Sequence, residues 1–104
     1  MAKQIKILPK SPKILATLTL TNTDYVALSS FFPDFTDALQ NGIFFKNVDD
    51  VQNVSIKKSS INNTQNELSI IGNDEIFIQT SDISDILIKV ASASGAQQVS
   101  IVAN

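Results

Sequence analysis

The sequence predicts an all-β fold, a single antiparallel β-sandwich, Ig-like or jelly-roll-like, of about eight strands with one short helical insert. Apolar residues alternate with polar ones in several short runs, which is the period of a half-buried strand. These runs recur about every 8–12 residues, with turns rich in Asn, Asp and Ser between them. One segment alone has a helical pattern.

The first clear strand covers residues 14–20, where apolar residues alternate with threonine. Side chains of a strand point to opposite faces in turn, so Ile14, Ala16, Leu18 and Leu20 are expected to face the core. The other expected strands are residues 25–28, 43–46, 54–57, 68–70, 76–78, 86–90 and 99–101.

Residues 33–42 carry the signals of a short helix. Pro33 suits the first helical position, Asp34 and Asp37 favour the positive end of the helix dipole, and Gly42 suits the C-terminal stop. One face of this helix would cover the core with the apolar residues spaced at i, i+3 and i+4: Phe35, Ala38 and Leu39.

Charge divides the chain into a basic N-terminal arm or edge strand, residues 1–12, and a β-sandwich domain, residues 13–104. The first 13 residues carry four lysines and no acid, whereas the remainder carries ten acids against four lysines. A basic arm on an acidic body predicts docking onto an acidic neighbour, including another copy of the chain. The alternative is a solvated edge strand whose lysines oppose aggregation. The lysines in question are Lys3, Lys6, Lys10 and Lys13.

The residue types on which most catalytic centres depend are missing. The chain contains no histidine, cysteine, arginine or tryptophan, so it lacks the commonest general base, the thiolate and the bidentate phosphate ligand. Its acids fall mostly in expected turns, where carboxylates keep ordinary pKa values rather than those of a glycosidase pair. We therefore expect no enzyme activity, no cofactor and no nucleic-acid partner.

Calcium is the more plausible use of the acids, because it takes oxygen ligands from loops. The candidate loops are residues 73–75 and 81–85, although neither has EF-hand spacing. Turn formation, with the carboxylates bonded to backbone amides, is the alternative interpretation.

The sequence also predicts no membrane partner. No run approaches the roughly 20 apolar residues that span a bilayer. Lysines at positions 3, 6 and 10 interrupt any apolar core of a signal peptide, so synthesis and assembly in a cytoplasm are expected.

Apolar surface remains as the candidate functional feature. Phe31 and Phe32, together with the pair Phe44 and Phe45, place four aromatic residues near one connection. Core packing would use most of them, but an exposed pair at Phe31 and Phe32 would anchor an interface. These two residues and the four lysines of the first 13 positions are the predicted partner-binding residues.

The order of the strand and turn motifs along the chain is similar to that of a known family of proteins. Residues 18–23 form a threonine-rich strand and turn, residues 26–29 read Val-Ala-Leu-Ser, and residues 43–47 and 54–56 follow as central strands. The end of the chain then has a turn, a strand, a connection, a strand, a Gly turn and a last strand: residues 71–78, 82–90, 94–95 and 99–102. This order resembles small virion structural proteins of tailed bacteriophages. The chain departs from their pattern at Gly72-Asn73-Asp74, where they have a Pro-Gly turn, and in its helical insert.

The resemblance implies a capsid decoration (cement) protein or a small adaptor of a tail or head fibre, with no catalytic residues to carry over. We therefore expect a homo-oligomeric virion protein that is assembled in the host cytoplasm and binds capsid or other virion proteins. Its arm would dock by strand addition to a neighbour. The alternative is a carbohydrate- or receptor-binding module using loop residues such as Tyr25, Asp49 and Asp50.

Overall fold

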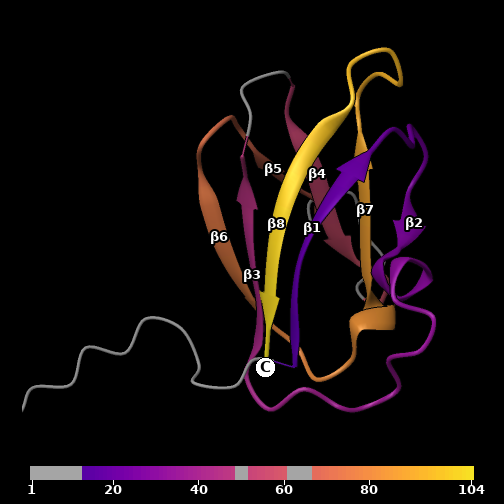
Figure 1. Ribbon diagram of the computed structural model, residues 1–104, viewed down its shortest axis with the longest axis vertical. Helices are drawn as coiled ribbons and strands as arrows, with labels where there is room; N and C mark the ends of the chain where they lie inside the picture. The colour runs from indigo at the N-terminus through magenta and orange to yellow at the C-terminus, as the bar shows by residue number, and fades with distance from the viewer. Residues whose placement is uncertain (1–12, 49–51, 61–66) are drawn as a thin grey trace, which may run out of the picture.

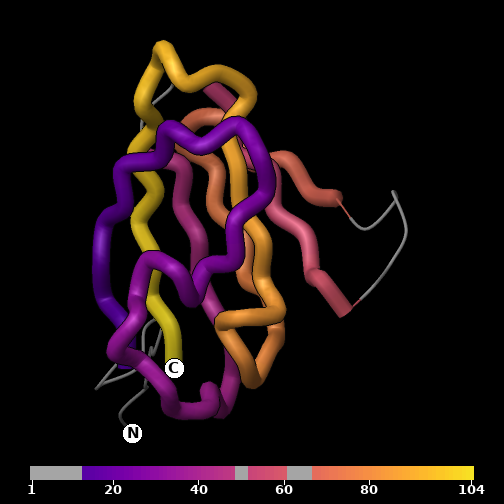
Figure 2. Tube along the Cα trace, turned by 90° about the vertical axis from the view of Figure 1, so that its right-hand side faces the viewer, coloured from indigo at the N-terminus to yellow at the C-terminus, as the bar shows by residue number. Residues whose placement is uncertain are grey.

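The computed structural model describes residues 13–48, 52–60 and 67–104, which form two four-stranded antiparallel sheets (Figures 1 and 2). One sheet has the strand order β1-β8-β3-β6 and the other β2-β7-β4-β5. The elements are β1 (Ile14–Leu20), β2 (Val26–Ala27), η1 (Leu28–Phe31), β3 (Gly42–Asn47), β4 (Val54–Lys58), β5 (Leu68–Ile70), β6 (Glu75–Gln79), η3 (Ile83–Asp85), β7 (Ile86–Val90) and β8 (Gln97–Ala103).

The strand pairing is nested, because β1 pairs with β8, β2 with β7, β3 with β6 and β4 with β5. The chain thus forms one long hairpin folded back on itself. Two further pairings, β3 with β8 and β4 with β7, roll this hairpin into two sheets. This strand order is that of an eight-stranded jelly roll. The predicted β-sandwich is confirmed, and of its two expected forms the jelly roll is the one found.

The alternation that predicted the strands also decides which side chains enter the core. In β1, Ile14 and Leu20 are buried while the threonines between them are exposed. Leu28 is fully buried, but it begins η1, so the second expected strand is shorter than its apolar run. Most of the core consists of isoleucine, valine and leucine contributed by both sheets. Burying each such side chain contributes about 1.5–3 kcal/mol of transfer free energy.

The helix predicted over residues 33–42 is wrong. The segment is irregular, and the short helical turn lies before it, in η1. Its backbone amides bond to distant segments: Leu39 donates to the carbonyl of Ser81 at 2.8 Å, and Gln40 to that of Asn104 at 3.1 Å. These hydrogen bonds outweigh a weak local propensity, as tertiary context commonly does. Leu39 is still buried, so the segment covers the core without being helical.

Gly42 is needed for a different reason from the helix end that the sequence suggested. Its φ is +148°, a region open to glycine and costly for other residues. A Cβ at this position would lie 2.2 Å from the carbonyl oxygen of Ile78, on the neighbouring strand β6. The glycine therefore lets β3 begin in close contact with β6.

Replacing Gly42 with alanine is expected to destabilise the fold. Backbone strain alone costs about 1–3 kcal/mol, and the contact with Ile78 adds to it. Urea unfolding of the Gly42→Ala variant measures the loss, with Gly72→Ala as the control, since Gly72 does not have a positive φ. Equal stability of the Gly42→Ala variant and the parent protein would contradict the close approach of β3 and β6.

Candidate interaction surface

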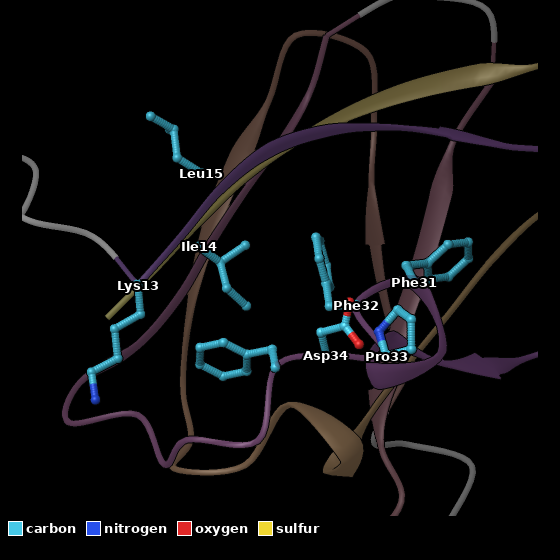
Figure 3. Close-up of a pocket in the computed structure, with 8 residues that line it drawn as sticks. Lys13, Ile14, Leu15, Phe31, Phe32, Pro33 and Asp34 are labelled. Atoms are coloured by element: carbon cyan, nitrogen blue, oxygen red, sulfur yellow. The ribbon is translucent and has the colours of Figure 1, made fainter.

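A pocket of about 490 Å³ lies between β1 and the segment that follows η1 (Figure 3). β1 is the edge strand of its sheet, since among the described strands it pairs with β8 alone. The lining residues come from the start of β1 and from the Phe-rich connection: Lys13, Ile14, Leu15, Phe31, Phe32, Pro33, Asp34 and Phe35.

The pocket is apolar inside and charged at its rim. Ile14 is buried, and three half-buried rings pack against the core behind it: Phe31, Phe32 and Phe35. Asp34 is exposed and is the one acid in the lining. The Lys13 ammonium donates a hydrogen bond to the carbonyl of Ala38 at 3.0 Å, which ties the start of β1 to the connection below it.

The structure brings three of the predicted partner-binding residues into this one pocket: Lys13, Phe31 and Phe32. Their binding role stays a prediction. The other predicted binding residues, Lys3, Lys6 and Lys10, lie outside the described part of the chain.

A row of apolar side chains crosses the outer face of the β1-β8-β3-β6 sheet. Strand register places Leu15 opposite Val102, Val102 opposite Phe44, and Phe44 opposite Phe77. Leu15 is 70% exposed and Phe77 is 48% exposed, while the two central residues are half-buried. The rings of Phe44 and Phe77 lie 5.3 Å apart at 60°, a favourable tilted arrangement. We call these four residues the apolar row.

The apolar row and the pocket meet at Leu15, which belongs to the row and also lines the pocket, but they lie on opposite sides of β1 (Figure 3). Figure 3 shows Ile14 and Leu15 on opposite sides of the β1 ribbon, as alternation requires. The next row along the same face is polar, with Thr17, Ser100, Lys46 and Glu75 at successive registered positions. One end of the sheet's outer face is therefore apolar and the adjoining strip is not.

Sequence reasoning missed the apolar row, although part of its signal was present. Residues 76–78 are apolar on both faces, and Leu15 interrupts the alternation with threonine. A half-buried strand needs only one apolar face, so these extra residues pointed outward. Their alignment into one row depends on strand order and register, which no local pattern contains.

On the outer face of the other sheet, polar side chains contact one another around Tyr25. The ring of Tyr25 lies 4.6 Å from the ammonium of Lys57 and 4.8 Å from that of Lys89, within cation–π range. Its hydroxyl donates a hydrogen bond to the Glu67 carboxylate. Burial, and then Glu67, raise the pKa of Tyr25 well above its ordinary value.

This arrangement bears on the predicted glycan-binding alternative. Tyr25 immediately precedes β2, and both its ring and its hydroxyl already have partners within the chain. A sugar would have to displace those contacts before stacking on the ring. Asp49 and Asp50, the other residues of that alternative, lie outside the described residues.

In the second of the predicted calcium loops, both carboxylates bond to the protein itself. Asp82 accepts hydrogen bonds from the amide and hydroxyl of Ser84 and so caps η3. Asn73 has a φ of +67° at the third position of a turn, where asparagine is tolerated. Across the described ranges 13–48, 52–60 and 67–104, no group of three or more acidic, histidine or cysteine residues could hold a metal ion.

Asp85 joins η3 to the end of β4. Its carboxylate accepts hydrogen bonds from the Ser59 hydroxyl and from both the amide and hydroxyl of Ser60, at 2.7–2.9 Å. Burial pushes the pKa of Asp85 upward, but these hydrogen bonds together with the Lys58 ammonium hold it below its ordinary value.

Replacing Asp85 with asparagine is expected to lower stability at pH 7 and to flatten its dependence on acid. A depressed carboxyl pKa adds stability above the unfolded-state value of about 3.9, and this stability is lost as pH falls through the lower folded-state pKa. Urea unfolding at pH 7, 5 and 3 should show the parent and the Asp85→Asn variant converging at the acid end. Ser60→Ala should give part of the effect. A pH-independent difference would contradict the assignment.

Buried polar residues form hydrogen bonds with the loops at one end of the sandwich, where β1 ends and β8 begins. Asn47 is fully buried and donates to the carbonyls of Gln52 and Ile70 at 3.0 and 2.9 Å. Gln97, also fully buried, accepts from the Gln52 amide at 2.9 Å. The Gln52 side chain reaches on to the backbone of Ser92. These contacts satisfy the buried amide donors of Asn47, which is a structural role, whereas the buried Oδ1 of Asn47 has no hydrogen-bond partner among the described residues.

Comparison with known proteins finds no matching family model, no matching curated protein and no matching solved structure. The resemblance to phage virion proteins therefore stays a prediction. Within the described residues, no helix is long and apolar enough to cross a membrane.

Proposed function

We propose that this protein is a binding module that docks onto other protein surfaces, and more specifically a structural protein of a bacteriophage virion that decorates or cements the capsid. The observation that carries the proposal is the apolar row, with Leu15 and Phe77 at its exposed ends. Aromatic residues in the centre of an exposed patch are typical of protein–protein interfaces.

The position of the row supports docking rather than packing within the chain. It lies on the outer face of a sheet whose inner face already forms the core, so folding does not need it. A solvated face of an antiparallel sheet is ordinarily polar, as the neighbouring row with Thr17 and Lys46 is. Apolar residues on such a face lower the free energy of the protein when a partner covers them.

The fold and the sequence add support of a weaker kind. Jelly rolls include viral capsid domains as well as lectins and cupins, so the fold accommodates the proposed role without requiring it. The order of strand and turn motifs supports the choice of a phage virion. A lattice-binding protein also uses the same contact many times, which suits a small rigid sandwich presenting one face.

The test is the mass of the purified full-length protein, alone and mixed with emptied particles of the phage whose genome encodes it. Stoichiometric binding at many sites on each particle is the expected result. Binding at a few sites would favour a fibre or neck adaptor over a decoration protein. No binding, combined with binding to a glycan array, would overturn the virion proposal in favour of a carbohydrate-binding module.

A further inference from the structure

The pocket beside β1 has the features of a peptide groove. One wall is the open edge of a strand, and the other is a connection carrying Phe31, Phe32 and Phe35. An open strand edge presents unpaired backbone donors and acceptors, which an extended segment can pair with. Apolar side chains of that segment would then enter the pocket at alternate positions.

We propose that this pocket receives residues 5–8 of a second copy of the chain. This segment reads Ile-Lys-Ile-Leu, and it is preceded by Lys3 and Gln4 and followed by Pro9 and Lys10. Docked as an added strand, it would place Ile5 and Ile7 on one face, toward the rings, and Lys6 on the other. The inference goes beyond the proposed virion role, since it concerns contact between two copies and can fail while that role holds.

Charge supports this occupant. The arm carries Lys3, Lys6 and Lys10 without an acid, and the pocket rim carries the exposed carboxylate of Asp34. Asp37 lies in the same connection and is also exposed. An apolar segment flanked by lysines therefore meets an apolar pocket around which two acids, Asp34 and Asp37, outnumber one lysine, Lys13. The Lys13 ammonium is bonded to the carbonyl of Ala38, so the acids favour a basic occupant.

Turn chemistry favours a second copy over the chain's own arm. The arm continues directly into Lys13, which lines the pocket, so its own residues 5–8 would have to reverse direction within residues 9–12. The commonest hairpin turns, with two-residue loops, rely on Gly, Asn or Asp to reach positive φ. Residues 9–12 read Pro-Lys-Ser-Pro and contain none of these. Docking into the pocket of a second copy requires no such reversal.

The experiment measures the mass of the full-length protein by sedimentation over a range of concentrations, without particles. The parent protein is expected to self-associate. An Ile7→Ser variant, with a defective arm, and an Asp34→Lys variant, with a defective pocket, should each weaken self-association at least about tenfold. Asp34 is exposed and Ile7 lies outside the described residues. Asp24→Lys serves as a control because it reverses an exposed acid away from the pocket.

One mixture of variants and one combined variant make the result independent of folding defects. The Ile7→Ser variant keeps a working pocket and the Asp34→Lys variant keeps a working arm, so together they should form a mixed complex through one intact contact. A chain carrying Lys3→Glu and Lys10→Glu together with Asp34→Lys should regain self-association, because it restores opposite charges between the flanks of the arm segment and the pocket rim. A monomeric parent protein, or self-association unchanged in both single variants, would overturn the inference and leave particle docking through the apolar row untouched.

Discussion

Replacing Phe45 with alanine is expected to lower the free energy of unfolding by about 3–5 kcal/mol, a large part of the stability of a domain this size. Phe45 is fully buried in β3, the strand flanked by β8 and β6, where it pairs with Ile101 and Ile76. Removing the ring leaves a cavity that two neighbouring strands cannot close without breaking their hydrogen bonds. Urea unfolding measures this change: the midpoint urea concentration should fall, while the dependence of the unfolding free energy on urea concentration stays the same.

The adjacent residue supplies a matched control. Phe44 precedes Phe45 on the same strand, but it points to the outer face, where its ring contacts Phe77. Phe44→Ala removes the same number of atoms from a half-buried site, so the expected loss is much smaller. Equal losses in the two variants, or the larger loss at Phe44, would mean that the register of β3 is shifted by one residue.

The strands were predictable from sequence because their cause is local. In residues 86–90, for instance, Ile86, Ile88 and Val90 recur at period two, and all three are buried in β7. Threonine on the other face of β1 made that strand equally clear. The choice between Ig-like and jelly-roll order was not predictable in this way, because pairs such as β1 with β8 join the two ends of the chain.

The connection at residues 33–42 shows where local signals fail. Pro33, Asp34 and Gly42 each occur at a typical helical position, yet each of those signals is worth only a fraction of a kcal/mol to a few kcal/mol. The competing contacts come from Ser81 and Asn104, more than 40 residues away along the chain. Gly42 allows β3 to begin in close contact with β6. Sequence alone cannot distinguish a glycine with this role from one that ends a helix.

The candidate interaction surface also has a part that the sequence predicts and a part that only the structure reveals. Lys13, Phe31 and Phe32 were predicted as binding residues because basic arms and adjacent aromatic residues are recognisable locally. Their binding role stays a prediction, and the two rings are half-buried rather than exposed. The apolar row could not, because Leu15 and Phe77 are separated by most of the chain and meet only through three successive strand pairings. A surface made by register becomes visible only with the structure.

The double substitution Leu15→Ser and Phe77→Ser is expected to weaken binding to emptied particles by at least about 30-fold, while the protein stays folded. Interface residues of this kind contribute about 2 kcal/mol or more, which corresponds to that factor. Leu15 and Phe77 occupy the two ends of the apolar row, so removing both shortens the surface by two of its four strands. Binding is measured by co-sedimentation with the particles, and folding by urea unfolding.

A control on the same strand and face isolates the row from the sheet as a whole. Thr17→Ser changes β1 two residues beyond Leu15, in the polar row, and should leave particle binding unchanged. The two substituted positions are largely exposed, so unfolding free energy should change far less than in Phe45→Ala. Particle binding that survives in the double variant would show that the outer face of this sheet is not the docking surface. The pocket beside β1 would then be the remaining candidate, to be tested against the particle with Asp34→Lys.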